Sequence, residues 1–159
     1  IYNRIVVTKT VEPVGKDIGF LPGTRDEKML PWLAPIQDNL QFLFGNDKMT
    51  LDMHIDEGRI EVEAMTYIRG RSICNSFIII DEAQNMNRHE IKTVLTRVGE
   101  GTKIVLTGDI EQIDNIYIDS TNNGLSYLVE KFKDQEIAGH VTLLKGERSK
   151  VASVSARIL

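Results

Sequence analysis

The sequence has a single cysteine, Cys74, in 159 residues, which excludes an intrachain disulfide. A disulfide-dependent secreted domain is therefore ruled out, and a reducing, cytoplasmic setting is expected. We expect Cys74 itself to be a small buried residue that leads into a strand. No apolar run approaches the length of a membrane span, and no basic-then-apolar signal segment opens the chain. We therefore expect no membrane partner.

The sequence also lacks an excess of basic residues, since 19 Lys and Arg face 23 Asp and Glu, for a net charge of −4. Nucleic-acid binding would therefore depend on a local basic patch. The three histidines are scattered without metal-ligand spacing, and no Ser-His-Asp or Cys-His combination is apparent. Asp52, Asp56 and Glu57 lie close together without the spacing of a calcium loop, which predicts a solvated turn.

With 42% hydrophobic and 26% charged residues, the chain is predicted to form one domain over residues 1–159. Apolar runs at 4–8, 60–65, 76–80, 103–106 and 141–144 predict strands. Amphipathic spacing predicts helices over about 24–45, 87–99 and 125–132, and again around 151–158. Short strands that alternate with helices predict an α/β fold with a mostly parallel sheet covered on both faces.

The strongest chemical signal is the apolar strand Phe77–Ile80, which is followed directly by Asp81 and Glu82. Ligands of parallel sheets bind outside the carboxyl ends of the strands, where these carboxylates are expected to lie. Asp81 can hold Mg²⁺ near nucleotide phosphates, and Glu82 can act as the general base for water that attacks the γ-phosphate. This is the Walker B arrangement. The alternative is an acidic turn after a buried strand, and these residues alone do not decide between the two.

A second polar segment follows the next predicted strand, as Thr107, Gly108 and Asp109, with Gln112 just beyond. Gly108 permits a close backbone approach, and Thr107 and Gln112 offer neutral polar groups that can sense the γ-phosphate. The Gln84 amide can donate to the same phosphate and orient water. Two neighbouring strands that end in such groups at one edge favour a phosphate site, with Thr107, Gly108 and Asp109 at the nucleotide, over two unrelated acidic turns.

Four basic residues are candidate anion contacts. Arg148 can reach transition-state charge in its own subunit or, as an arginine finger, in a neighbour's site; the alternative is a solvated or salt-bridged surface residue. Arg69 and Arg71 flank Gly70 and either contact phosphates of a nucleotide or RNA or pair with nearby acids. Lys9, after the first strand, is a candidate nucleic-acid backbone contact, with a solvated lysine as the alternative.

The sequence lacks the phosphate-binding Gly-x-x-x-x-Gly-Lys-Ser/Thr loop (Walker A) that such a site needs. The nearest stretches, Val14–Asp17 and Leu21–Thr24, have neither the paired glycines nor the Lys-Ser/Thr ending. The chain starts at Ile1, without an initiator Met, and ends on Leu159 inside a predicted helix. We expect a domain truncated at its N-terminus, with its first strand and Walker A loop lost, and at its C-terminus as well. This chain alone is then expected to bind ATP poorly and to hydrolyse little of it.

Taken together, these residues resemble the PhoH family of P-loop ATPases, which are similar to superfamily-one helicases. The resemblance runs through nearly the whole chain in order, in the segments 13–23, 67–72, 77–85, 107–114 and 147–149. One detail departs from the family's pattern, because the first strand is followed by Lys9-Thr10 where relatives often carry an Arg.

The resemblance implies a three-layer, RecA-like P-loop NTPase domain that binds ATP and Mg²⁺ and couples hydrolysis to RNA unwinding or remodelling. It also implies a homo-hexameric ring with sites at subunit interfaces, which would give Arg148 its role in a neighbour's site, and in some members a fused PIN-type nuclease. By position, Asp81 would serve the metal, Glu82 the base, and Gln84 and Gln112 the γ-phosphate.

Two alternatives stay open. One is a nucleotide-switched RNA-binding or assembly module without motor activity, and the other is a different P-loop enzyme such as a small kinase. No acceptor-substrate motif supports the kinase, whereas the pair Gln84 and Gln112 suits a water-positioning role.

Overall fold

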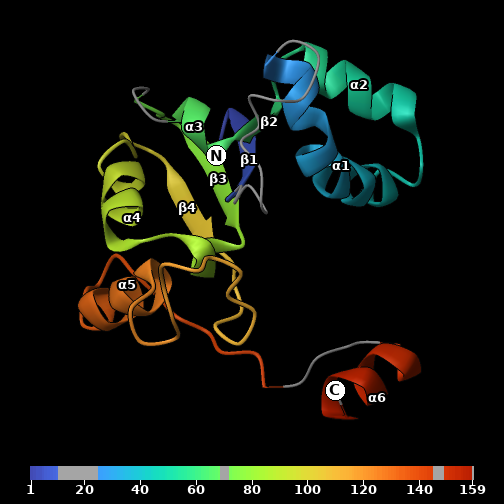
Figure 1. The fold of residues 1–159 in the computed structure, drawn as a ribbon. Helices are drawn as coiled ribbons and strands as arrows, with labels where there is room; N and C mark the ends of the chain where they lie inside the picture. The colour runs from blue at the N-terminus through green and yellow to red at the C-terminus, as the bar shows by residue number, and fades with distance from the viewer. Residues whose placement is uncertain (11–24, 69–71, 145–148, 159) are drawn as a thin grey trace.

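Four parallel strands form the centre of this computed structural model, which describes residues 1–10, 25–68, 72–144 and 149–158. Figure 1 shows the sheet, whose order is β2-β1-β3-β4. The strands are β1 (Arg4–Lys9), β2 (Ile60–Ala64), β3 (Ser76–Asp81) and β4 (Lys103–Leu106). Each begins where the apolar pattern places it and ends within one residue of the prediction. The predicted α/β fold with a parallel sheet is therefore confirmed.

The register of the strands brings their carboxyl ends to one edge of the sheet. Lys9 of β1 stands opposite Ala64 of β2 on one side and Asp81 of β3 on the other. Ile80 of β3 stands opposite Leu106, the last residue of β4. Because all of these pairs are parallel, the segments that follow β1, β3 and β4 leave the sheet side by side.

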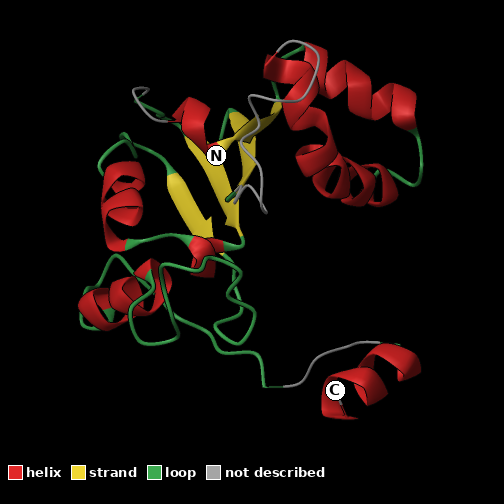
Figure 2. Cartoon of the chain, in the orientation of Figure 1, coloured by secondary structure: helices red, strands yellow, loops and turns green. Residues whose placement is uncertain are grey.

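Helices cover both faces of the sheet, as Figure 2 shows. On one face, α4 (Arg88–Leu95) and α5 (Gly124–Phe132) pack over a cluster that includes Ile78 and Ile80. On the other face, α1 (Arg25–Leu43) packs against Ile79. Alternate residues of β3 thus serve two cores, which explains why its sequence is apolar without interruption.

Asparagine side chains cap the starts of two helices. A capping box begins α4, with the Asn87 side chain accepting from the Glu90 backbone at 2.9 Å and the Glu90 carboxylate accepting from the Asn87 backbone at 3.0 Å. Asn123 caps α5 by accepting from the backbone of Ser126 at 2.8 Å. The last helix, α6, spans Lys150–Ile158. These caps fix where the chain leaves each loop.

The predicted strand at 141–144 is wrong. This segment is irregular in the structure, and Val141, Leu143 and Leu144 are each at least 80% exposed. In the described part of the chain no strand lies beside it. A strand is stable only when a neighbour pairs with its backbone groups, so the β-branched sequence alone does not produce one here.

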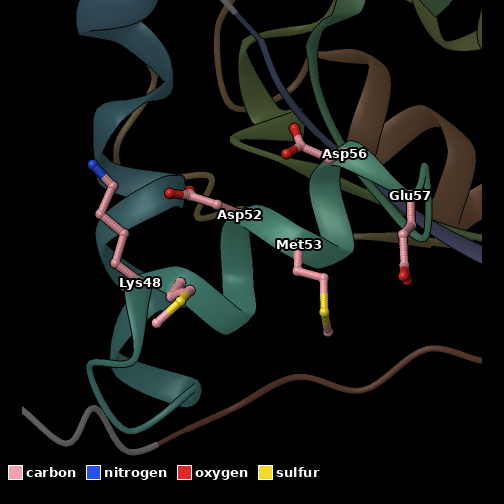
Figure 3. Close-up of a pocket in the computed structure, with 6 residues that line it drawn as sticks. Lys48, Asp52, Met53, Asp56 and Glu57 are labelled. Carbon is pink, nitrogen blue, oxygen red and sulfur yellow. The ribbon is translucent and has the colours of Figure 1, made fainter.

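The acidic residues predicted to form a solvated turn lie instead on α2 (Lys48–Asp56) and its C-terminal cap, Glu57. Figure 3 shows Asp52, Met53 and Asp56 along this helix, beside a shallow depression. Asp47 caps the start of the helix by accepting from the Thr50 backbone at 3.1 Å and from its hydroxyl at 2.7 Å. These hydrogen bonds to Thr50 hold the pKa of the Asp47 carboxyl below its usual value.

Two further differences from the sequence prediction are local. A short helix, α3 (Met65–Ile68), follows β2 without a clear signal in the sequence. Cys74, predicted to be buried, is exposed, because the neighbouring Ile73 takes the fully buried position in a bridge to Val98. In an extended segment successive side chains point to opposite sides, so burial of Ile73 turns Cys74 outward.

Candidate active site

The two polar segments predicted to share one edge of the sheet are bonded to each other. The Thr107 hydroxyl donates to Asp81 Oδ1 at 2.8 Å. The backbone adds two bonds, from Thr107 N–H to the carbonyl of Ile80 and from Ala83 N–H to the carbonyl of Thr107, both at 2.9 Å. The turns after β3 and β4 therefore form one structural unit at the carboxyl edge, where parallel sheets bind ligands.

Glu82 has an unusual backbone conformation in this unit. Its φ of 57° and ψ of 37° lie in the left-handed region, just before the short 3₁₀ helix η2 (Ala83–Asn85). Residues other than glycine adopt such conformations at a cost of roughly 1–3 kcal/mol, and they concentrate at functional sites. Gln84 donates to Glu82 Oε2 at 2.7 Å, and Lys9 Nζ lies 3.6 Å from Glu82 Oε1. The half-buried carboxylate is thus held from two sides.

Gln84 is fully buried, and its amide joins the two turns. Its Nε2 donates to Glu82 and also to the carbonyl of Gln112, the latter at 2.9 Å. Its Oε1 accepts from the backbone of Asp109 at 3.2 Å. The sequence predicted that this amide approaches the γ-phosphate, but in this structure it faces protein groups. Its geometry suits the support of Glu82 and of the segment after β4.

The remaining predicted residues of this segment lie nearer the surface. Gln112 is exposed, and its side chain donates to Asp109 Oδ2 at 2.6 Å. Asp109 is half-buried and also accepts from the backbone of Glu111 at 3.0 Å. Thr107 and Gly108 are exposed at the same edge. The exposed side of the unit therefore carries hydroxyl, amide and carboxylate groups that a ligand can reach.

Two buried asparagines that the sequence did not single out complete the unit. The Asn85 side chain accepts from the backbones of Asp114 and Asn115 at 2.8 and 3.2 Å, and Asn115 donates to the Asn85 carbonyl at 3.0 Å. These hydrogen bonds fix the position of Asp114 and Asn115, just after Gln112. Asn85 directly follows Gln84, but its partners lie 29 and 30 residues away, so only the folded chain reveals its role.

Other predicted site residues are placed differently. Lys9 reaches Glu82, whereas Arg69, Arg71 and Arg148 lie outside the described residues. No group of three or more His, Cys, Asp and Glu side chains gathers as a metal site among the residues that the structure describes. Asp81 still fits Mg²⁺, because its carboxylate is half-buried beside the Thr107 hydroxyl, and Mg²⁺ in phosphate sites commonly takes one or two carboxylates together with water.

Gly108 is where the two turns approach most closely. A Cβ placed there would lie 2.6 Å from Gln84 Oε1, 2.8 Å from Leu125 Cδ2 and 3.1 Å from the Gln84 backbone nitrogen. Gln84 cannot move aside without breaking its hydrogen bonds. Gly108→Ala is therefore expected to lower the free energy of unfolding by about 1–3 kcal/mol, measured by urea denaturation. The matched control is Gly139→Ala, where a Cβ meets nothing within 4 Å. Equal stability of the two variants would contradict the close approach.

A comparison with protein families agrees with the parallel α/β fold described above. The family model described as PhoH-like protein matches residues 1–156. The chain belongs to the PhoH family. Its parallel sheet with helices on both faces is consistent with the P-loop NTPase-like domain of that family. In the described part of this PhoH-family chain, no helix is long and apolar enough to cross a bilayer.

Named relatives match over most of the chain. Protein PhoH2 of Bacillus subtilis (strain 168) is 62% identical over 161 residues, which cover 100% of this chain and 36% of the relative. Protein PhoH2 of Mycolicibacterium smegmatis is 40% identical over 99% of the chain and 36% of the relative. Protein PhoH of Escherichia coli K12 is 37% identical over 87% of the chain and 39% of the relative. The chain thus spans 36–39% of the length of these relatives.

Proposed function

We propose that this PhoH-family chain is the part of an ATPase domain that supplies the metal-binding and water-activating groups. In the full-length protein, ATP hydrolysis by this domain then drives RNA unwinding or remodelling. The observation that carries the proposal is the bonded unit at the carboxyl edge of β3 and β4, where the Thr107 hydroxyl donates to Asp81 and Glu82 follows directly in the chain. Membership of the PhoH family supports an ATPase-like domain.

Asp81 is the proposed metal ligand. The Thr107 hydroxyl occupies one of its carboxylate oxygens and thereby fixes the orientation of the group. Mg²⁺ held there would neutralise charge that develops on the transferred phosphoryl group. Thr107, which contacts this carboxylate, and the next two residues, Gly108 and Asp109, are exposed or half-buried and are the proposed contacts to the nucleotide.

Glu82 is the proposed general base. Its half-buried carboxylate is held by Gln84 on one oxygen, yet a carboxylate has about four acceptor positions and can still accept a hydrogen bond from water. The exposed Gln112 amide beside Asp109 is the proposed partner of the γ-phosphate. The buried Gln84 amide donates to the proposed base and holds it in place. A base held in one position abstracts a proton more efficiently than a mobile one.

The remaining parts of the proposal rest on the sequence and the family resemblance. Arg71 is the proposed nucleotide contact, Arg69 the proposed RNA contact, and Arg148 the proposed arginine finger in a neighbouring subunit. The proposed partners are RNA and identical subunits in a hexameric ring, with a fused or associated PIN-type nuclease as a further partner. The proposed location is the cytoplasm.

The test uses the full-length protein. We expect phosphate release that depends on ATP and Mg²⁺, together with strand separation of a fluorescently labelled RNA duplex that requires ATP hydrolysis. Absence of phosphate release would contradict the ATPase. Phosphate release with RNA binding that merely switches on and off with nucleotide would replace the motor by a nucleotide-switched RNA-binding module.

A further inference from the structure

Lys9 joins β1 to the candidate base. It is the last residue of β1 and stands in register with Asp81, the last residue of β3. Its ammonium Nζ lies 3.6 Å from Glu82 Oε1, which is ion-pair range and longer than a hydrogen bond. The two side chains are only 26% and 36% exposed. An ion pair that is partly shielded from water is screened less than one on the open surface.

The pair with Lys9 completes the immobilisation of the Glu82 carboxylate. Gln84 donates to Oε2 at 2.7 Å, and Lys9 faces the other oxygen, Oε1. The left-handed backbone of Glu82, with φ of 57°, fixes the direction in which the side chain starts. Three independent constraints from β1, η2 and the backbone thus determine where the carboxylate lies.

We propose that Lys9 is a positioning residue for the Glu82 general base. This inference rests on the proposed ATPase function. The ammonium holds one carboxylate oxygen so that the remaining acceptor positions face the attacking water. A misplacement of about 1 Å in a reacting group can cost on the order of 10²-fold in rate, so loss of one of the constraints is expected to slow hydrolysis.

This assignment differs from the two roles that the sequence suggested for Lys9. A solvated lysine would extend into water, whereas this side chain is three-quarters shielded and faces an acid. A nucleic-acid contact would need the ammonium to face a phosphate, whereas its partner is Glu82. By contrast, Arg4 at the opposite end of β1 pairs with Glu61 of β2, which lies away from the candidate site. Lys9 is therefore the cation of β1 that can act on the base.

The experiment compares the Lys9→Met and Lys9→Arg variants of the full-length protein. The matched control is Lys103→Met, because Lys103 is exposed and begins β4 at the opposite edge of the sheet. We expect Lys9→Met to lower kcat at least about tenfold while KM for ATP and the Kd values for ATP and for single-stranded RNA stay within about twofold. Lys9→Arg should restore most of the rate, and Lys103→Met should match the wild type.

A double-mutant cycle separates positioning of the base from other roles. Under single-turnover conditions, Lys9→Met should cost nothing further in a Glu82→Gln background, because the base that it positions is already absent. Wild-type kcat in Lys9→Met would overturn the inference, and so would an equal rate loss in both backgrounds. A weaker RNA affinity with unchanged kcat would assign Lys9 to nucleic acid instead. If the wild type releases no phosphate, the proposed ATPase fails and this inference with it.

Discussion

Glu82→Gln is expected to lower ATP turnover by roughly 10²–10⁴-fold, which is the usual contribution of a general base. The amide keeps the shape of the side chain and can still accept from Gln84, but it cannot take a proton from water. ATP affinity should therefore stay within about twofold of the wild type, since only the transition state loses an interaction. The measurements, made on the full-length protein, are phosphate release at saturating ATP and equilibrium binding of a fluorescent ATP analogue.

The control for this substitution is Glu100→Gln, which makes the same chemical change at an exposed glutamate before β4. Its turnover should equal that of the wild type. If Glu82→Gln kept turnover within about threefold of the wild type, the effect would be far below that of a general base. Water would then be activated by another group, and the role of the Glu82 turn would be structural.

Gln84→Leu is expected to lower the free energy of unfolding by about 2–4 kcal/mol, because it removes three hydrogen bonds that contribute about 0.5–1.5 kcal/mol each. Leucine has a similar volume, so packing is largely kept and the hydrogen bonds are what is lost. The substitution removes the donor to Glu82 and to the Gln112 carbonyl and the acceptor for the Asp109 backbone. Urea denaturation measures the change, and phosphate release should fall in the same variant.

A matched control is Gln135→Leu, where the side chain is exposed beyond the end of α5. It should change stability by no more than about 0.5 kcal/mol, as exposed substitutions usually do. Equal stability of the two variants would show that the Gln84 amide does not hold the turns after β3 and β4 together. The account of Glu82 as a supported base would then lose one of its constraints.

The sheet and the meeting of the two polar turns at one edge were predictable from the sequence, because both follow from local patterns. Uninterrupted apolar runs marked β3 and β4, and a parallel sheet brings the residues after such strands to one edge. The hydrogen bond between Thr107 and Asp81 confirms that reasoning. The same local reasoning failed at 141–144, where the strand-like sequence has no neighbour to pair with in the described structure.

The internal support of the site was not predictable, since it depends on contacts between distant residues. The inward orientation of Gln84 follows from groups 25 and 28 residues away in the sequence. The ion pair of Lys9 with Glu82 requires the register of β1 against β3, which no periodicity reveals. The left-handed backbone conformation of Glu82 was not predictable either, because glutamate has no preference for that conformation. Sequence patterns thus indicated the candidate reacting groups, and the structure shows which residues contact them.

The most direct test of the central claim is the dependence of phosphate release on Mg²⁺ concentration in the wild type and in Asp81→Asn. The comparison uses the full-length protein. Asparagine keeps the shape of the side chain but removes the charge that attracts the metal. We predict that Asp81→Asn needs at least about tenfold more Mg²⁺ for half-maximal release, or releases no phosphate at all. Superimposable Mg²⁺ curves for the two proteins would contradict an ATP-hydrolysis site at the carboxyl edge of β3 and β4.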